Sequence, residues 1–572
     1  MAIKSLKIMA DFETTVDPSD VRVWAGCAVD IEALEVVHIG NDLEGFMEYL
    51  KNKNTVCYFH NLKFDGEFIL YWLFTHGFKY NPGVDKKGNR VALTDKEFTC
   101  LITDDGLFYS IEVVFHRQNS KKYEKVTFYD SLKKLPFKVS VIAKAFELAM
   151  SKGEIDYKAP RPRGYEMTPE EKDYIIRDCK IVAEALKIQF TQGLKKMTNA
   201  SDALNGYKTI IGNLFEKWFP VLPVELDADL RRAYKGGFVY LNPKYRGYRG
   251  LKGITLDVNS LYPWVMYTKI LPYGYPMYFE GAPEPDEKYP LYIIHMKCCF
   301  ELKPDHIPTL QLKNNRRYVE TEYLTTSRVD MGGYEDNDPV EMWLTNVDYE
   351  LLMDHYDLTD VEYINGFKFK GAVGMFKDYI DYWMHIKETT TGALRQLAKL
   401  MLNSLYGKFA TNPKARKKIP YLDPEDNVVR YSYSEYEFRD PVYTAMGAFI
   451  TAYAREKTIR SAQSVYDRFI YADTDSLHLV GQEPPEGLEI HKTHLGAWKN
   501  EGCFEDSKFI RAKTYMETVD GVTKVTCAGM PDNVKEKVTY ENFHSGSTFD
   551  GKLMPRRYPG GIILEETTFT IK

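Results

Sequence analysis

The sequence has few cysteines, and their spacing does not fit a metal module or a disulfide framework. There are eight cysteines, no C-x-x-C pair among them, and Cys298 and Cys299 are merely adjacent. This excludes the common zinc modules and the dense disulfide framework of small secreted domains. Reduced thiols are typical of a cytoplasm, where we expect the chain to reside.

Long apolar runs are also missing. No stretch approaches the roughly 18 apolar residues of a transmembrane helix, and the N-terminus has no basic segment followed by an apolar run, as a signal peptide would. There is no internal repeat or low-complexity tract. We therefore expect a globular protein that is neither secreted nor in a membrane.

The sequence has no excess of positive charge: its net charge is −6. DNA binding needs only a local basic track, and a metal-dependent enzyme concentrates acids at its sites, so this balance does not exclude a nucleic-acid enzyme. Aromatic residues are plentiful, at 14% with 42 Tyr, and some could stack on bases. The 572 residues suffice for about four domains.

The first candidate site begins with acids near the N-terminus. Residues 4–11 are predicted to be a strand, and Asp11 and Glu13, two positions apart, share one face of it. A second strand is predicted to end at residues 56–60, and Asp65 is expected in the loop NLKFDG that follows.

A capped helix completes this site. Thr168, followed by Pro169 and then Glu171, has the pattern of a helix N-terminus, and the helix is predicted to run to about residue 192. Tyr174 and Asp178 are four positions apart, so they share a helical face. Carboxylate oxygens are the ligands that Mg²⁺ and Mn²⁺ prefer, and two such ions can activate a water for phosphodiester cleavage. The tyrosine can orient that water.

The second candidate site is a group of three acids. Asp257 follows an apolar run, and Asp473 and Asp475 lie in YADTDS, where the pattern predicts a hairpin with acids at its tip. Asp257 and Asp475 can hold two Mg²⁺ ions against a triphosphate.

Between these acids lies the predicted helix LRQLAKLMLNSLYG. Its Arg395, Lys399, Asn403 and Tyr406 are spaced by four, four and three positions and share one face. A cationic face on an otherwise apolar helix suits the neutralisation of phosphate.

The remaining pattern divides the chain. Residues 198–205 (TNASDALN) are polar and small and predict a linker, and residues 376–409 predict helices with a break at TTTG. Residues 411–440 predict a hairpin-like insertion, residues 447–466 a helix, and residues 560–572 a strand. Strands are also predicted at residues 237–241, 254–258 and 469–472.

Six motifs resemble those of family B DNA polymerases, in the expected order. DFETT, HNLKFDG and the Y-x-x-x-D helix are similar to the three exonuclease motifs, and DVNSLYP, KLMLNSLYG and YADTDS to the three polymerase motifs. YKGGF, YDSLKKLPF, KGEIDY, TAYAR and KTY are similar to stretches of the protein-primed branch, the phi29-like phage DNA polymerases. The chain's short length supports this branch.

The resemblance implies a multidomain α+β and α/β fold: an RNase H-like 3′–5′ exonuclease domain followed by a right-hand polymerase domain with two insertions. The expected boundaries are 1–198 for the exonuclease domain, 199–268 for the first part of the palm, 269–374 for insertion 1 (terminal-protein region 1), 375–410 for the fingers, 411–443 for insertion 2 (terminal-protein region 2), 444–527 for the second part of the palm and 528–572 for the thumb.

The resemblance also implies residue roles. The exonuclease metals are expected to be bound by Asp11, Glu13, Asp65 and Asp178, with help from Tyr174. The polymerase metals are expected to be bound by Asp257, Asp475 and the Val258 carbonyl, with Asp473 nearby. The single-stranded 3′ end is expected to contact Thr14, Asn61, Phe64, Ser131, Leu132 and Lys152. The nucleotide is expected to contact Tyr262, which excludes a 2′-hydroxyl, and Lys387, Arg395, Lys399, Asn403 and Tyr406. Template or primer is expected to contact Tyr234, Gly236, Gly237, Thr451, Arg455, Lys513 and Tyr515, with Lys513 and Tyr515 on one strand face.

The function expected from the resemblance is template-directed DNA synthesis with 3′–5′ proofreading, primed by a terminal protein and displacing the non-template strand of a linear phage genome. The expected cofactors are two Mg²⁺ ions per active site, which Mn²⁺ can replace. The expected partners are template–primer DNA, deoxynucleoside triphosphates and the terminal protein, for a monomeric enzyme in the cytoplasm of an infected bacterium.

Two other hypotheses remain open. The chain could be a 3′–5′ exonuclease with a vestigial polymerase fold, or a DNA-binding scaffold without enzymatic activity. The acids at 257 and 475 and the cationic face of Lys399 disfavour the first, and the metal-competent acids at two sites disfavour the second.

Overall fold

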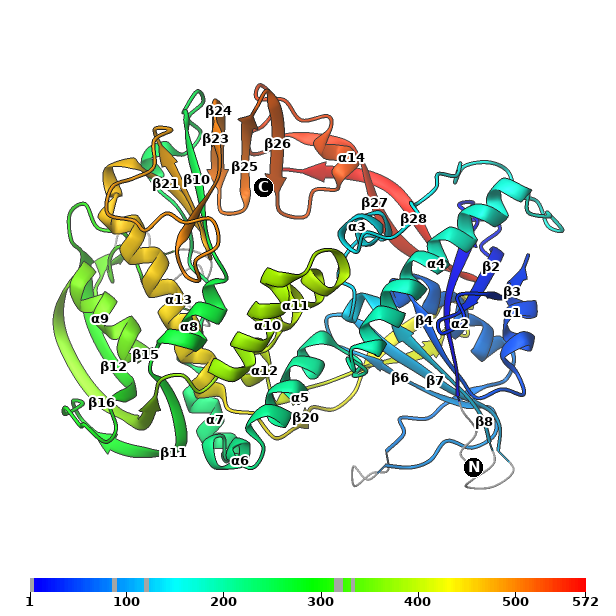
Figure 1. Cartoon of the computed structure of the whole chain (residues 1–572), viewed down its shortest axis with the longest axis horizontal. Coiled ribbons are helices and arrows are strands. Elements are labelled where there is room, and N and C mark those ends of the chain that lie inside the picture. Colours follow the sequence, from blue (N-terminus) through cyan, green and yellow to red (C-terminus); the bar gives the residue numbers. More distant parts are fainter. Residues whose placement is uncertain (1–4, 85–89, 118–122, 313–322, 331–334) are drawn as a thin grey trace.

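The N-terminal domain is built on an eight-stranded sheet (Figure 1). The computed structural model describes residues 5–84, 90–117, 123–312, 323–330 and 335–572. The strand order is β3-β2-β1-β4-β8-β7-β6-β5, in which β4 runs parallel to both β1 and β8. The strands are β1 (Leu6–Thr14), β2 (Val23–Asp30), β3 (Val36–Gly40), β4 (Thr55–Phe59), β5 (Lys79–Tyr80), β6 (Glu97–Ile102), β7 (Phe108–Arg117) and β8 (Tyr123–Asp130).

Both faces of this sheet are covered by helices, because β1 is apolar on both sides. Met9 packs into the core cluster that includes α4 (Pro169–Thr191), whereas Ile8 and Ala10 pack into the cluster of α1 (Leu43–Leu50) and α2 (Leu62–Thr75). The shorter η1 (Ser131–Lys133) and α3 (Val139–Ala145) connect β8 to α4. Residues on the Met9 side of β1 therefore face α4.

The predicted start of α4 is confirmed. The Glu171 amide donates to Thr168 Oγ1 at 3.2 Å, and the Thr168 amide donates to Glu171 Oε2 at 3.0 Å, which is a complete capping box. The helix ends at Thr191 with Gln192 as its C-cap, as expected.

Two local predictions are wrong. The expected linker at 198–205 is the beginning of α5 (Asn199–Ile211), because Thr198 caps this helix by accepting a hydrogen bond from the Ser201 amide. The expected loop after β4 is α2, whose first amide groups donate to Asp130 of β8. That cap comes from a residue far away in the sequence, so local pattern does not reveal it.

The second half of the chain is centred on a five-stranded antiparallel sheet of order β23-β10-β22-β21-β9, whose strands all lie in the residues predicted to form the palm. The predicted strands at 237–241, 254–258 and 469–472 belong to it, and the predicted long helix near 447–466 is α13. The palm elements are β9 (Val239–Leu241), η2 (Pro243–Tyr245), β10 (Gly253–Val258), α8 (Leu261–Thr268), α13 (Thr444–Ser464), η3 (Tyr466–Arg468), β21 (Phe469–Asp473), β22 (Ser476–Val480) and β23 (Trp498–Phe504).

Helices α10 and α11, the fingers, lie between the palm and the N-terminal domain (Figure 1). They confirm the helices predicted for 376–409, including the break at TTTG. The helices in this region are α10 (Lys377–Thr389), α11 (Gly392–Ser404) and α12 (Tyr406–Phe409). Two further helices, α6 (Leu214–Trp218) and α7 (Val224–Arg231), precede β9 in the chain.

Two β-rich regions extend from this frame. Between α8 and α10 lies a four-stranded sheet of order β11-β16-β12-β15 with α9 (Asn346–His355); its strands are β11 (Leu271–Glu280), β12 (Leu291–Leu302), β15 (Val340–Thr345) and β16 (Tyr356–Ala372), with β13 (Val329–Asp330) and β14 (Glu335–Asp336) nearby in sequence. After α12 come β17 (Lys414–Ala415), β18 (Lys418–Leu422), β19 (Val429–Tyr433) and β20 (Glu437–Phe438), in which β18 and β19 form the predicted hairpin.

The C-terminal region, from β24 to the end of the chain, returns to the N-terminal domain, and its last part, 528–572, is the predicted thumb. Its elements are β24 (Asp506–Arg511), β25 (Thr514–Val519), β26 (Val522–Cys527), α14 (Asp532–Lys535), β27 (Thr548–Tyr558) and β28 (Gly561–Thr570), the last of which confirms the predicted terminal strand. In Figure 1 the hairpin of β27 and β28 crosses from beside β26 and α14 to the N-terminal domain.

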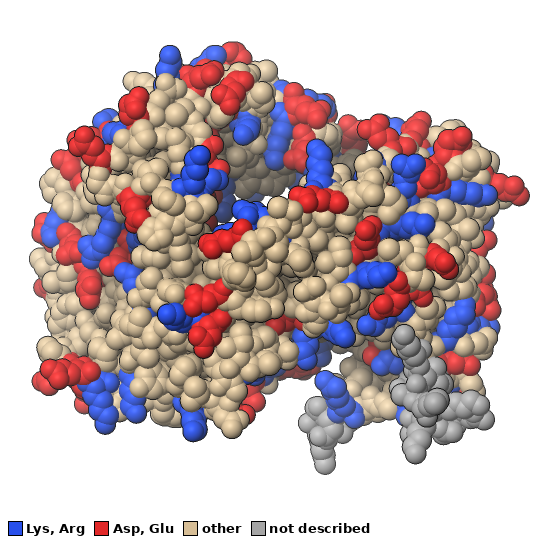
Figure 2. Space-filling view, in the orientation of Figure 1, with Lys and Arg blue, Asp and Glu red and all other residues tan. Residues whose placement is uncertain are grey.

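The tip of this hairpin touches the N-terminal domain so closely that only glycine fits. A Cβ on Gly560 would lie 2.1 Å from the Val21 carbonyl oxygen, and one on Gly561 would lie 2.4 Å from the Phe68 ring. The chain therefore closes into a ring, and Figure 2 shows a hollow between its two upper lobes with Lys and Arg side chains at the edge. Within the ranges described above, no helix is both long and apolar enough to cross a membrane.

Candidate active sites

The first acidic cluster forms where β1, α2 and α4 meet. Asp11 and Glu13 lie on the face of β1 that α4 covers, and Asp178 follows Tyr174 by one helical turn on α4. Asp65 approaches from the first turn of α2 and not from a loop. The side chains are largely buried: Glu13 is 8% exposed, and Asp65 and Asp178 are each 4% exposed.

Burial and mutual repulsion make these acids hard to ionise. The pKa of Asp11 is raised to about 7 by burial and by the neighbouring Asp178. Burial raises the pKa of Glu13 and of Asp65 as well, with a further contribution from Asp11. Lys152 offsets part of this, because its Nζ lies 2.9 Å from Asp178 Oδ2. The cluster therefore favours the arrival of additional positive charge.

The donor set fits a hard divalent cation. Asp65 Oδ1 and Asp178 Oδ1 are buried and have no hydrogen-bond partner, which leaves two carboxylate oxygens free to bind an ion. Among the residues whose positions are described, no three His, Cys, Asp or Glu side chains already converge into a finished metal site.

A cavity of about 1090 Å³ opens onto Asp11, Glu13 and Asp178. The predicted 3′-end residues Thr14, Asn61, Phe64 and Lys152 line it. Its other wall includes Leu553, Ile563 and Leu564 of the β27–β28 hairpin. Sequence reasoning missed this wall, because no local pattern indicates that residues 548–572 return to the first domain.

Ser131 lies behind the residues that line the cavity. It is fully buried, its hydroxyl donates to the Phe59 carbonyl at 3.0 Å, and it lies 2.8 Å from His60 Nδ1. It therefore supports His60, which lines the cavity, and its contact with a DNA strand stays a prediction. Leu132 is half-buried and is not among the residues that line the cavity. Tyr157, which the sequence did not single out, pairs its hydroxyl with that of Tyr174 at 2.7 Å.

The second acidic cluster sits at the end of two palm strands. The predicted β21–β22 hairpin presents Asp473 and Asp475, and its turn residue Thr474 has a φ of 60°. The Val258 amide donates to the Asp475 carbonyl at 2.8 Å, which joins this turn to the end of β10, where Asp257 lies. The pKa of Asp257 is raised to about 7 by burial and by Asp475 and Glu501. As in the first cluster, closely spaced carboxylates fit Mg²⁺ by charge and donor type.

These acids share a cavity of about 780 Å³ with a cationic wall from the fingers. Arg395, Lys399, Asn403 and Tyr406 all line it, as their common face predicted, and so does Lys387, which donates to Ser260 Oγ at 2.8 Å. Burial lowers the pKa of Lys387 and of Lys399, and neighbouring cations lower both further. This wall is therefore electrostatically suited to a polyanion.

Aromatic stacking closes one end of this cavity. The rings of Tyr262 and Tyr406 are 4.0 Å apart between centroids and tilted by only 17°. Sequence reasoning missed several lining residues, among them Lys492, Thr493 and Lys499. Lys499 pairs with Asp257 in the register of β10 and β23, a long-range pairing that no sequence spacing indicates.

The glycine loop before β9 lies against the acidic turn. A Cβ on Gly237 would lie 2.5 Å from Thr474 Oγ1, so this position requires glycine, whereas Gly236 faces open space. The Thr474 amide donates to the Phe238 carbonyl at 2.7 Å. Tyr234 is half-buried beside this loop.

Three residues predicted to contact DNA have protein partners in this structure, and their contact with DNA stays a prediction. Thr451 is 1% exposed and its hydroxyl donates to the Gly447 carbonyl at 3.1 Å, whereas Arg455 is 3% exposed and forms a bidentate ion pair with buried Asp348. Arg455 also donates to the Gly236 carbonyl at 2.8 Å, so it holds the glycine loop. Lys513 is not on a strand face with Tyr515: it lies in the turn before β25 with a φ of 55°, and its Nζ is 3.3 Å from Asp473 Oδ1.

Comparison with known proteins agrees with this geometry. The family described as DNA polymerase type B, organellar and viral, matches residues 47–492. The DNA polymerase of Bacillus phage Nf is 47% identical over 98% of this chain and 99% of its own length. A solved structure of phi29 DNA polymerase with primer–template DNA superposes with a TM-score of 0.92 at 45% identity, covering 99% of this chain and 100% of that one. A second, with primer–template DNA and incoming nucleotides, gives a TM-score of 0.91 at 46% identity.

The chain belongs to the type B DNA polymerases, with an exonuclease domain followed by palm, fingers and thumb. Within that family it is a phi29-like phage DNA polymerase.

Proposed function

We propose that this chain copies a DNA template and removes mispaired 3′ ends in a second, separate site. The observation that carries this proposal is the presence of two acidic clusters, each opening onto its own cavity, of which only the palm cluster faces the cationic wall of the fingers. A triphosphate needs such a wall, whereas a single phosphodiester does not.

At the palm site, Asp257, Asp475 and the Val258 carbonyl would hold two Mg²⁺ ions, or Mn²⁺ in their place. When bound, these ions supply the charge that favours in-line attack of the primer hydroxyl on the α-phosphate. Lys387, Arg395 and Lys399 would hold the triphosphate. The stacked Tyr262 and Tyr406 form a rigid wall that would hold the base pair and exclude a 2′-hydroxyl by clash.

At the exonuclease site, Asp11, Glu13, Asp65 and Asp178 would hold the metal ions, and Tyr174 would orient the attacking water. Lys152, which now pairs with Asp178, would move to the phosphate of the bound strand. Asn61 and Phe64 would hold the single-stranded 3′ end against the cavity wall that Leu564 contributes.

We also propose that a terminal protein supplies the first priming hydroxyl and that the enzyme displaces the non-template strand. The support for both is the similarity to phage polymerases of this branch and the two β-rich regions beside the palm and N-terminal domain. On this proposal the enzyme acts on a linear phage genome in the cytoplasm of the infected bacterium.

The test is extension of a primed single-stranded circle with and without Mg²⁺. We expect Mg²⁺-dependent products much longer than one circle, because synthesis continues by displacement. Products that stop at one circle would contradict strand displacement but not polymerisation. Degradation without any extension would support the alternative of an exonuclease with a vestigial polymerase fold.

A further inference from the structure

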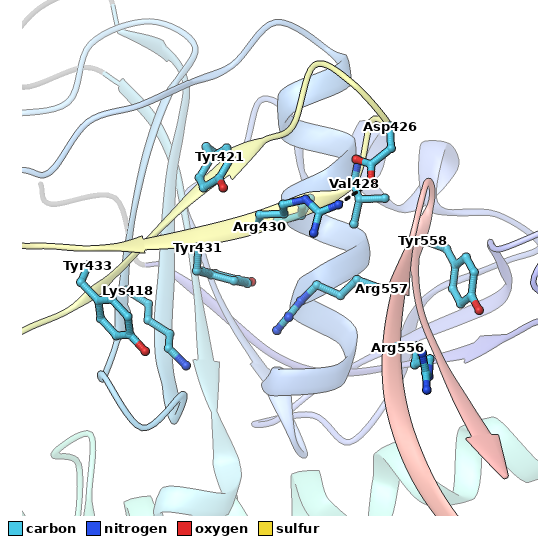
Figure 3. A pocket seen from close by; sticks show the side chains of 11 residues that line it. Lys418, Tyr421, Asp426, Val428, Arg430, Tyr431, Tyr433, Arg556, Arg557 and Tyr558 are labelled. Carbon is cyan, nitrogen blue, oxygen red and sulfur yellow. Dashed lines mark hydrogen bonds and ion pairs between the residues drawn. The ribbon is translucent and has the colours of Figure 1, made fainter. Parts of the chain in front are cut away.

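Three distant parts of the chain meet beside helix α2. Val429 of β19 and Ile562 and Ile563 of β28 belong to the same apolar cluster as Phe68 of α2. A cavity of about 650 Å³ lies next to this junction, between the β18–β19 hairpin and the tip of the β27–β28 hairpin (Figure 3). This junction closes the ring described above.

An ion pair joins α2 to β27 at this junction. Glu67 of α2 is 1% exposed, and its Oε1 accepts a hydrogen bond from Arg557 Nε of β27 at 2.8 Å. The Arg557 guanidinium also lies over the ring of Tyr431 in β19, 4.7 Å from its centroid. One arginine therefore contacts the N-terminal domain and the second insertion at once.

Glu67 depends on Arg557 for its compensating charge, because its own helix offers no comparable cation. A carboxylate this deeply buried is strongly disfavoured as an ion without a compensating charge. The cation that α2 itself carries is Lys63, whose side chain is exposed. Separating the hairpin from α2 would therefore leave an uncompensated buried charge.

The neighbouring arginine is arranged differently. Arg556 is 68% exposed and pairs at 2.8 Å with Glu565 of its own hairpin. Figure 3 shows Arg557 extending toward Tyr431, whereas Arg556 projects away from it. Two adjacent residues of equal charge thus differ in whether they connect the hairpin to the rest of the ring.

We propose that Glu67 and Arg557 are positioning residues that lock the thumb hairpin to the N-terminal domain and so keep the ring closed around DNA during synthesis. This inference rests on the proposed polymerase function, since it assumes that duplex DNA occupies the hollow in Figure 2. Glu67 lies two residues after Asp65 on α2, so the helix that carries an exonuclease acid also anchors the hairpin. The same hairpin lines the exonuclease cavity, so its position matters to both sites.

The test is single-encounter extension of a primed circle. The enzyme is bound first, and nucleotides, Mg²⁺ and an excess of trap DNA are added together, so that product length reports retention. We expect R557Q to shorten the products about tenfold, and added salt to shorten them further. The products of R556Q should be as long as those of the unmodified enzyme. Addition of the first nucleotide with enzyme in excess should be the same for all three, since neither arginine touches the palm cavity.

A charge exchange separates the ion pair from simple packing. E67K alone places two cations together and should shorten products, whereas E67K/R557E should restore most of the length. Equal lengths for R557Q and R556Q would overturn the inference, since the apolar contacts alone would then hold the ring. Failure of the exchange to lengthen products relative to E67K would also overturn it. If the unmodified enzyme did not add the first nucleotide, that result would instead refute the proposed function.

Discussion

The two acidic sites contain the same chemical groups but differ in the cations around them. In the exonuclease site Glu13, Asp65 and Asp178 are almost fully buried, and the cations that line the cavity are Lys152, which pairs with Asp178, and Lys158. In the palm site the acids share their cavity with Lys387, Arg395, Lys399, Lys492 and Lys499. The difference follows from the ligand: a single phosphodiester and its metal ions need little added charge, whereas a triphosphate carries several negative charges that the protein must match.

Removing one acid at each site should give the largest effect and tests whether the two sites act independently. D257A or D475A should lower DNA synthesis about a thousandfold or more and leave 3′–5′ degradation intact, because a metal-binding carboxylate acts on the transition state. D11A should do the reverse. Primer extension and single-strand degradation, measured on the same folded preparations, check this. Loss of both activities in either variant would show that the sites are not independent.

Removing one lysine from each cavity should give the next largest effect on the two reactions. K399M should raise the nucleotide KM by roughly tenfold to a hundredfold, since a charge-assisted contact to phosphate is lost. Degradation should not change. K152M should weaken degradation by a similar factor and leave the nucleotide KM unchanged, because Lys152 lines the exonuclease cavity and does not line the palm cavity. Steady-state kinetics of both reactions on both variants decide whether the cations are as site-specific as the geometry indicates.

Dependence on pH tests what the two sites have in common. The pKa of Asp11 and that of Asp257 are both raised to about 7, so below pH 7 protons compete with metal ions for these carboxylates. The Mg²⁺ concentration for half-maximal activity should therefore be about tenfold higher at pH 6 than at pH 8 in both reactions. A metal requirement that stays constant between these pH values would contradict the raised pKa values.

The sequence predicted those parts of the sites that lie within one element. Asp11 and Glu13 share a strand face, and Tyr174 and Asp178 share a helix face, so spacing alone brings each pair together. The assignment to a polymerase family and its domain order came from resemblance of motifs, not from spacing. The resemblance could place Asp65 in the site but not in a helix, because the cap of α2 comes from Asp130.

The parts that could not be predicted depend on contacts between distant residues. Arg455 has the chemistry of a DNA contact, but the buried Asp348 of α9 takes its guanidinium into the interior. Lys499 reaches the palm site only because β23 pairs with β10. The thumb wall of the exonuclease cavity exists only because the last hairpin closes the ring.

Lys499 gives the smallest expected effect and sharpens the comparison further. Its Nζ lies 2.5 Å from Glu501 Oε1, and 40% of its side chain is exposed, so its charge is partly neutralised and screened before a nucleotide arrives. K499M should therefore raise the nucleotide KM about threefold, well below the effect of K399M, and leave degradation unchanged. K524M, at an exposed position of β26 that lines neither cavity, is the matched control. An effect of K499M as large as that of K399M would mean that the palm strand, and not the fingers alone, carries the main contact to the triphosphate. An effect no larger than that of the control would confine the cationic wall to the fingers.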